Sequence, residues 1–374
     1  MTMNKKKLWW FNPENDIALA RNIASFTPPK AGVEMRRAGA LLPMWLGGSG
    51  DMVDCEGVDE ALLSRWQHDF RIEVEPWNHC TTELSPTPWG WSEAARKHFI
   101  DCGFNLDALP RGDVLDRMRM LSHRRTAARV ARIVSEQADF ALWPSAEEAT
   151  DVEELRRLIS RPGCWVVKSP WSSSGRGLLY ADSGNIERVI SSAAGTIRQQ
   201  GSVMVEHAAR RLLDFAMLFN AGDSGVEFVG YSVFDADDRG AYQGNIVDND
   251  DALKALITQY IPERQLDDVR TMLSSAIAQV IGNDYLGPIG VDMLIADNNG
   301  ENILDAVVEI NFRYTMGFVA HALARHVAKR GRFACLHRPS TACADYELDD
   351  TGRITKGCLG LTQPGCNFDF VLEV

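Results

Sequence analysis

The stretch Glu309-Ile310-Asn311-Phe312-Arg313, read together with Asp292 seventeen residues before Glu309, decides how this chain is interpreted. Two apolar segments, 289–295 and 303–311, flank a polar turn with Asn299-Gly300, a pair typical of a tight β-hairpin. Side chains alternate along a strand, so Glu309 and Asn311 share a face, and the turn would bring Asp292 roughly opposite them. Three hard oxygen ligands would then converge, as Mg²⁺ requires. The alternative is an exposed hairpin with scattered polar residues.

A loop of small residues follows an apolar strand that ends in a lysine. The strand is expected at 165–168, and the loop comprises Ser172, Ser173, Ser174, Gly175, Arg176 and Gly177. Serine and glycine let backbone N–H groups approach an anion closely, while Lys168 and Arg176 add positive charge. The loop has neither the Gly-Lys-Ser/Thr of a Walker loop nor the third glycine of a dinucleotide fingerprint. It predicts a flexible hairpin that closes over phosphates, with a plain surface turn as the alternative.

The order of these elements resembles the ATP-grasp superfamily over roughly residues 113–330. A basic pair before a helix comes first, followed by the strand ending in Lys168, the glycine–serine flap, an apolar strand ending in Glu206, and a later acid at 214. The hairpin that contains Asp292, Glu309 and Asn311 completes the pattern. Its Glu-x-Asn-x-Arg ending is similar to the carboxylase, carbamoyl-phosphate and amino-acid ligase branch. The resemblance implies an α/β (α+β) ATP-grasp fold of three domains.

The resemblance also implies which residues bind the nucleotide. Lys168, which would serve in both binding and catalysis, and one of Arg124 or Arg125 would hold the ATP phosphates under the flap of residues 172–177. Glu206 and the backbone around His207 would contact the adenine. The carboxylate of residue 214, an aspartate, would bind the ribose hydroxyls.

The metal and the chemistry are assigned by the same resemblance. Asp292, Glu309 and Asn311 would ligate Mg²⁺, and Arg313 would act on the reacting phosphate or a substrate carboxylate. Two features depart from the family's pattern. Asp214 lies one residue further from Glu206 than the family's pattern has. Some branches carry an arginine where this chain has Gly290, so stabilisation of an acyl phosphate is expected from Arg313 or Arg239.

Length, composition, charge and cysteine pattern limit the kinds of function that the protein can have. A chain of 374 residues with 45% hydrophobic and 24% charged residues predicts a soluble enzyme of two or three domains. A net charge of -12 argues against nucleic-acid binding, which needs a basic surface. The apolar run 8–11 is too short for a signal peptide or a membrane span, so we expect a cytoplasmic protein without a membrane partner. The eight cysteines include no Cys-x-x-Cys pair and are expected to be ordinary thiols.

The chain divides by pattern into three predicted domains. Residues 1–112 form an N-terminal α/β pre-ATP-grasp domain, 113–205 a central lid domain, and 206–374 a C-terminal domain whose tail from about 331 has no assignable period. Within the first domain we expect strands at 8–11 and 41–46 and helices at about 29–40 and 92–103.

Four polar residues follow the first strand: Asn12, Glu14, Asn15 and Asp16. Ligands of open α/β sheets bind beyond the carboxyl ends of strands, so these residues are candidates for substrate contact. A turn whose polar side chains bond their own backbone is an equal alternative.

These features together predict an ATP-dependent ligase that joins a carboxylate, from an amino acid or small peptide, to an amine through an acyl phosphate. The cofactors would be ATP and Mg²⁺, the partners small molecules, and a homodimer is one possible assembly. A kinase or carboxylase of the same fold, or a non-catalytic nucleotide-binding sensor, are the competing hypotheses. No Gly-x-Ser-x-Gly nucleophile elbow is present in the sequence.

Overall fold

The computed structural model describes residues 5–172, 177–237, 242–337, 345–363 and 365–374. The chain folds as two compact units, each assembled from separate stretches of sequence. The first contains residues 1–116, 243–253 and 313–374, and the second contains residues 117–242 and 254–312. The division into three domains expected from the sequence stays a prediction.

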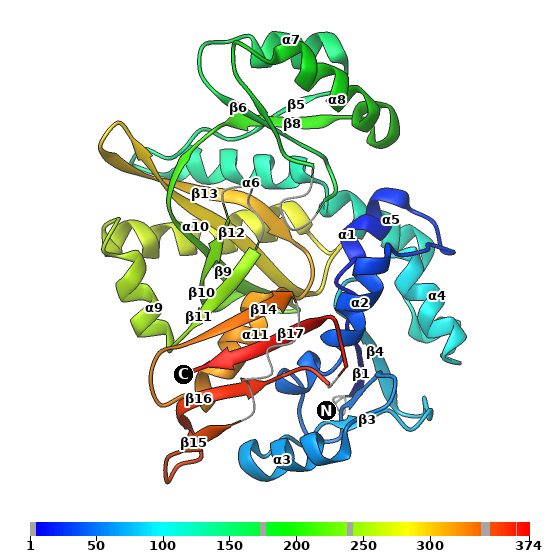
Figure 1. Cartoon of the computed structure of the whole chain (residues 1–374). Helices are drawn as coiled ribbons and strands as arrows, with labels where there is room; N and C mark the ends of the chain where they lie inside the picture. The colour runs from blue at the N-terminus through cyan, green and yellow to red at the C-terminus, as the bar shows by residue number, and fades with distance from the viewer. Residues whose placement is uncertain (1–4, 173–176, 238–241, 338–344, 364) are drawn as a thin grey trace. The chain divides into compact units, whose positions relative to one another are not determined.

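A parallel sheet with strand order β3-β2-β1-β4 opens the first unit (Figure 1). Its strands are β1 (Lys6–Trp10), β2 (Met52–Val53), β3 (Glu75–Pro76) and β4 (Leu84–Pro88). The α-helices of this unit are α1 (Asn15–Arg21), α2 (Lys30–Ala38), α3 (Glu60–Phe70), α4 (Glu93–Asp101) and α11 (Met316–Leu323). Its 3₁₀ helices are η1 (Leu42–Trp45), η2 (Leu106–Ala108) and η3 (Ala324–His326). The expected first strand and both expected helices are therefore confirmed.

Two local predictions in this unit are wrong. The expected strand at 41–46 is the 3₁₀ helix η1, in which Pro43 lies in the first turn and four consecutive side chains are buried. Proline is compatible with a helical first turn but removes a donor from a strand. The expected loop at 12–16 ends sooner than predicted, because Asn15 and Asp16 already belong to the first turn of α1.

The C-terminal tail, which the sequence left unassigned, is a set of antiparallel strands in the first unit. The strand order is β11-β14-β17-β16-β15. The bounds are β11 (Tyr242–Val247), β14 (Gly331–His337), β15 (Tyr346–Leu348), β16 (Ile354–Gly360) and β17 (Phe368–Glu373). Phe370 of β17 packs edge-on against Phe11 at 6.2 Å, inside one hydrophobic core shared by both ends of the chain. Cys358 in β16 is disulfide-bonded, contrary to the expectation of ordinary thiols throughout.

The second unit holds a long antiparallel sheet with strand order β13-β12-β9-β10. Its strands are β9 (Arg210–Gly222), β10 (Gly225–Ala236), β12 (Gly287–Asn298) and β13 (Glu301–Asn311), and the helices α6 (Arg124–Gln137) and α10 (Glu263–Ile281) pack against it (Figure 1). Asn299 and Gly300 close the β12–β13 hairpin with φ of 58° and 96°. Both angles are in the left-handed region that Asn-Gly adopts readily, so the predicted hairpin is confirmed.

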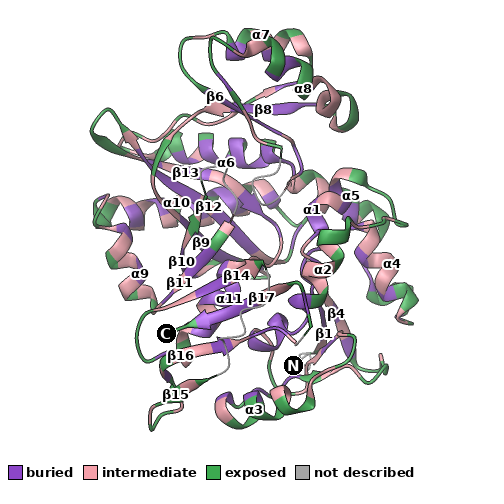
Figure 2. Cartoon of the chain, viewed as in Figure 1, coloured by how far each residue is buried: buried purple, intermediate pink, exposed green. Residues whose placement is uncertain are grey.

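A smaller antiparallel sheet, ordered β5-β8-β6-β7, also belongs to the second unit. It consists of β5 (Glu147–Ala149), β6 (Trp165–Lys168), β7 (Leu179–Ala181) and β8 (Val203–His207). The helices α7 (Val152–Ile159) and α8 (Ile186–Gln200) cover it and share an apolar core with it. Figure 2 shows β8 and the inner strands of the long sheet largely buried. The predicted strand–flap–strand order of 165–181 is thereby confirmed at the described residues.

The chain passes between the units at four points: within α5 (Gly112–Leu121), at the start of β11, within α9 (Asp250–Ile257) and just after β13. Across the described ranges, no helix is both long enough and apolar enough to cross a membrane.

Candidate active site

The β12–β13 hairpin brings the three predicted metal ligands together. Asp292 lies directly opposite Glu309, and Gly290 lies opposite Asn311. The Asn311 side-chain amide donates a hydrogen bond of 3.1 Å to Asp292 Oδ2. All three side chains therefore lie on one face of the sheet, as alternation along the strands predicts. Asn311 is buried, whereas Asp292 and Glu309 are partly accessible.

Strand β9 adds a third acid to this face. Asp214 pairs in register with Leu294, two positions along β12 from Asp292. Burial raises the pKa of the Asp214 carboxyl, and the ion pair with Arg211 partly offsets this effect. Lys168 is near enough to Asp214 to act on that pKa as well. The predicted ribose ligand is thus in the electrostatic neighbourhood of the predicted phosphate ligand.

Lys168 and Glu206 form an ion pair on the smaller sheet. Lys168 lies opposite Met204 and Glu206 lies opposite Val166, so both side chains project from the same face of β6 and β8. The Lys168 residue is only 7% exposed. A buried ammonium requires a partner, and Glu206 supplies it here. An incoming phosphate group would be able to share or replace that partner.

Asp305 is a residue of this site that the sequence reasoning missed. It lies on β13, four residues before Glu309 and opposite Leu294. Burial, reinforced by the negative charge of Glu206 and opposed by Lys168, raises the pKa of Asp305 to about 7. A signal was available, because Asp305 is the one acid inside the apolar run 303–308, at the even spacing that places it on the face of Glu309.

Arg124 connects the metal hairpin to the flap. Its guanidinium forms a 2.7 Å ion pair with Glu309 Oε2. The same group donates to the Ser169 carbonyl at 3.0 Å and to the Ser172 carbonyl and hydroxyl at 3.3 and 3.2 Å. Arg124 is therefore positioned both at the proposed ligand set and at the base of the flap.

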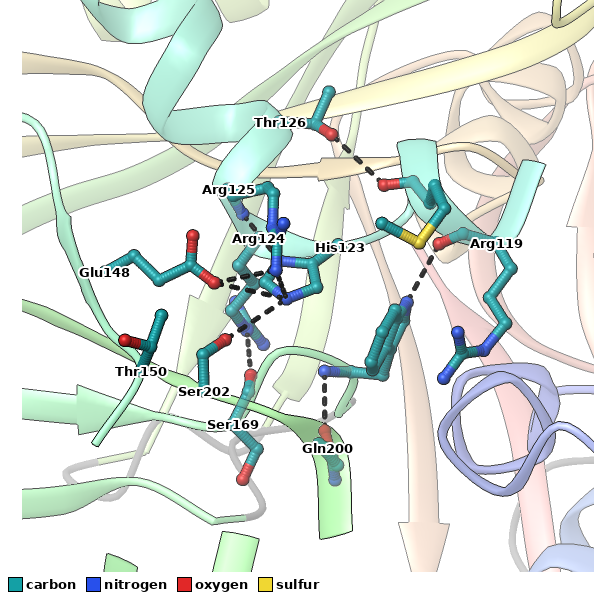
Figure 3. A network of polar contacts seen from close by, with 12 residues as sticks. Arg119, His123, Arg124, Arg125, Thr126, Glu148, Thr150, Ser169, Gln200 and Ser202 are labelled. Atoms are coloured by element: carbon teal, nitrogen blue, oxygen red, sulfur yellow. Dashed lines mark hydrogen bonds and ion pairs between the residues drawn. The ribbon is translucent and has the colours of Figure 1, made fainter. Parts of the chain in front are cut away.

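Arg125 points elsewhere. It pairs with Glu148 at 2.8 Å, its Nη2 lies 3.1 Å from His123 Nε2, and it is half exposed (Figure 3). Of the two arginines that the sequence left as alternatives, Arg124 is the one at Glu309. Burial, together with the charges of Arg125, Arg119 and Arg124, lowers the pKa of His123 to about 3. The neutral ring accepts a hydrogen bond from the Arg125 backbone N–H, which caps α6.

The flap is described at its two ends. Ser172 is held by Arg124, and Gly177 has a φ of 76°, a conformation that favours glycine. Ser173, Ser174, Gly175 and Arg176, which were predicted to cover phosphates, lie outside the described residues, as does Arg239.

The His207 side chain lies on the opposite face of β8 from Glu206. It pairs across the strands with Trp165, and the two rings are 3.9 Å apart. Burial and the nearby Arg161 lower the pKa of His207. The adenine contact expected of the backbone around His207 stays a prediction.

The four N-terminal candidates lie in the first unit, where each of the four side chains has at least one partner. The Asn12 side chain both donates to the Gly90 carbonyl at 2.9 Å and accepts from the Gly90 N–H at 3.2 Å. It also donates to Asn15 Oδ1 at 3.3 Å. These bonds join the end of β1 to the end of β4, which is a structural role.

Glu14 and Asp16 each form an ion pair with an arginine of the same unit. Asp16 receives two bonds from Arg313, at 3.1 and 2.7 Å, in the bidentate arrangement typical of arginine–carboxylate pairs. Glu14 pairs with Arg36, and its side chain is 4% exposed. Its second oxygen, Oε2, finds no hydrogen-bond partner among the described residues. An unsatisfied buried oxygen is consistent with a ligand donor, so Glu14 remains the strongest substrate candidate of the four.

Comparisons with known proteins bear on the fold. No family model matches the chain, and no curated protein matches it. Among solved structures, a biotin carboxylase from Campylobacter jejuni in complex with β-γ-ATP is similar with a TM-score of 0.54 at 12% identity, over 99% of this chain and 87% of that one. The chain has the ATP-grasp fold, as the sequence predicted.

Two further solved structures are similar at lower scores. The biotin carboxylase domain of 2-oxoglutarate carboxylase from Hydrogenobacter thermophilus has a TM-score of 0.48 at 11% identity, covering 99% of this chain and 86% of that one. The N5-carboxyaminoimidazole synthetase from Staphylococcus aureus has a TM-score of 0.46 at 13% identity, covering 90% and 83%.

Proposed function

We propose that this chain is an ATP-dependent ligase that activates a carboxylate as an acyl phosphate and joins it to an amine. The proposal rests on one observation above the others: Asp292, Glu309 and Asn311 converge on one sheet face, with Arg124 at Glu309. It is supported by the ATP-grasp fold, because the similar Campylobacter jejuni enzyme is a carboxylase crystallised with a nucleotide.

The donor chemistry of the hairpin fits Mg²⁺. Two carboxylates and one amide offer hard oxygen atoms, and Mg²⁺ prefers a few such ligands with phosphate and water completing its shell. Asp292, Glu309 and Asn311 would hold the ion, which when bound would neutralise part of the triphosphate charge. The Arg124–Glu309 pair would have to open, which would free the guanidinium for a phosphate oxygen.

The remaining residues would act by position and charge. Lys168 would contact the phosphates, and its pairing with Glu206 keeps the ammonium in place before the nucleotide binds. The backbone around His207 would contact the adenine, and Asp214 the ribose. A carboxylate oxygen would attack the γ-phosphorus as ADP leaves. The amine would then attack the acyl carbon, phosphate would leave, and the amine proton would pass to solvent.

An isotope experiment tests this reaction. The protein is screened with pairs of amino acids and other carboxylates for ADP release, and an active carboxylate is then supplied labelled with ¹⁸O. The proposed chemistry predicts one ¹⁸O atom in the released phosphate and an amide in the product. A kinase would leave the phosphate on the product, and a carboxylase would require bicarbonate. Either outcome, or ADP release that no substrate stimulates, would contradict the proposal.

A further inference from the structure

Three side chains of different chemistry, Asp54, His98 and Cys102, meet in the first unit. His98 lies on α4, and Cys102 caps the C-terminal end of that helix four residues later. A spacing of four places both on one helix face. Asp54 follows β2 directly, and its backbone N–H bonds to the Trp9 carbonyl at 2.8 Å, which holds it at the carboxyl end of the parallel sheet.

The three side chains converge on one point. Asp54 Oδ2 lies 2.7 Å from His98 Nε2, and Cys102 Sγ lies 3.6 Å from the same nitrogen. All three potential ligand atoms lie within 4.8 Å of one another. A thiol nucleophile with a histidine base would need the acid and the thiol on opposite ring nitrogens. Here the Asp54 carboxylate and the Cys102 thiol both lie next to His98 Nε2, so the arrangement resembles a set of metal ligands and not a catalytic triad.

The spacing of these atoms suits a tetrahedral metal ion. Bonds of about 2.0–2.3 Å to zinc place ligand atoms about 3.3–3.7 Å apart. The distance from Cys102 to His98 already has this value, and the distance from Asp54 to His98 needs to lengthen by less than about 1 Å. The Trp10 ring stacks on His98 at 3.8 Å with an interplanar angle of 8°, which fixes the imidazole plane.

The site is accessible enough for a metal ion to enter it from solvent. The His98 and Asp54 side chains are 27% and 21% exposed. Three protein ligands leave one tetrahedral position for water or a small ligand, as in open zinc sites. A thiolate and an imidazole select zinc-like ions over Mg²⁺, so this donor set differs from the hard oxygens of the hairpin.

We propose that Asp54, His98 and Cys102 bind a zinc-class divalent ion with one open coordination position. Binding would release the Cys102 thiol proton to solvent, since the thiolate is the ligand. The sequence predicted ordinary thiols, because no Cys-x-x-Cys pair is present. A His-x-x-x-Cys spacing on a helix, with an acid supplied by a distant strand, is a weaker sequence signal. The proposed ligase activity does not depend on this site.

The first test uses Co²⁺ as a spectroscopic substitute for zinc in the full-length, chelator-treated protein. One equivalent of Co²⁺ should produce thiolate-to-metal charge-transfer absorption, Zn²⁺ should remove it, and excess Mg²⁺ should not. Cys102→Ser should abolish this absorption and His98→Gln should weaken Co²⁺ binding by at least about tenfold. Cys80→Ser, at an exposed free thiol, should change neither.

The second test needs no variant. Zinc should slow alkylation of Cys102 in the wild-type protein, measured peptide by peptide by mass spectrometry, while Cys80 reacts as before. Absence of charge-transfer absorption in the wild type, its persistence in Cys102→Ser, or unchanged alkylation of Cys102 with zinc would each overturn the proposal.

Discussion

The β12–β13 hairpin and the loop at 12–16 are both rich in acids and amides, but they use them differently. In the hairpin the side chains converge: Asn311 bonds to Asp292, which lies opposite Glu309. In the loop they mostly diverge to partners outside it: Asn12 bonds to Gly90 as well as to Asn15, and Asp16 bonds to Arg313.

This difference teaches how to separate a ligand site from a structural one. Converging oxygens repel one another unless a cation joins them, so they are retained for binding. Diverging groups each satisfy a neighbour and stabilise the fold. We therefore expect substitutions in the hairpin to reduce turnover and substitutions in the loop to reduce stability.

The largest expected effect comes from the hairpin. Glu309→Gln and Asp292→Asn should each lower ATP turnover by about 10³-fold, because each removes an anionic metal ligand with little change in shape. Steady-state ADP release measures the loss, and circular dichroism checks the fold. Glu301→Gln, an exposed acid in the same hairpin, should retain activity. Near wild-type rates in the first two variants would make the cluster structural.

The loop provides the converse test. Asp16→Asn should lower the free energy of unfolding by about 2–3 kcal/mol, because the largely buried Arg313 loses its bidentate partner. Urea denaturation measures this change, with the exposed Asp107→Asn as the matched control. If Asp16→Asn raises only the KM of a substrate and leaves stability unchanged, then the loop is a binding site in the same sense as the hairpin.

Asp305 predicts a pH dependence. Its folded pKa of about 7 lies above the ordinary 3.8, so the native state holds a proton that the unfolded state has lost between those pH values. Stability contributed by this group is present below about pH 4 and is lost as pH rises through 7.

Asp305→Asn removes that dependence. The shift from 3.8 to about 7 corresponds to at most about 4 kcal/mol, which partial exposure of the residue reduces to about 2 kcal/mol. The variant should therefore be more stable than the wild type by about 2 kcal/mol at pH 9 and equal to it near pH 4. Denaturation midpoints across this range measure the difference, and a pH-independent offset would argue against a protonated Asp305.

The smallest predicted effect concerns the phosphate contact. Lys168→Met should slow turnover by at least about tenfold, as loss of one charge-assisted contact costs about 1.5–3 kcal/mol. The exposed Lys329→Met serves as the matched control. Equal losses in both variants would attribute the effect to overall charge.

Much of the fold was predictable because its signals are local. Asn299-Gly300 sets the hairpin, and the alternation of 303–311 sets which side chains share a face. The tail was not predictable, because β14–β17 are short strands whose pairing and packing against Phe11 depend on residues more than 300 positions away. The 3₁₀ helix at 42–45 was missed because an apolar run of that length does not distinguish a strand from a helical turn.

The residues of the candidate site likewise divide into those that the sequence could group and those that it could not. Residues of one strand, such as Glu309 and Asn311, can be paired from the sequence. Partners from different elements cannot, and the choice between Arg124 and Arg125 depended on which one reaches Glu309. Asp305 was overlooked because its significance comes from Lys168 and Glu206 on another sheet.

Titration calorimetry of ADP binding, with and without Mg²⁺, tests the central claim most directly. The wild-type protein and the double variant Asp292→Asn/Glu309→Gln are compared at equal concentration. The account predicts that Mg²⁺ strengthens ADP binding by at least about tenfold in the wild type and has no effect in the double variant, which stays folded. Equal Mg²⁺ dependence in both proteins would contradict the assignment of the hairpin as the metal site.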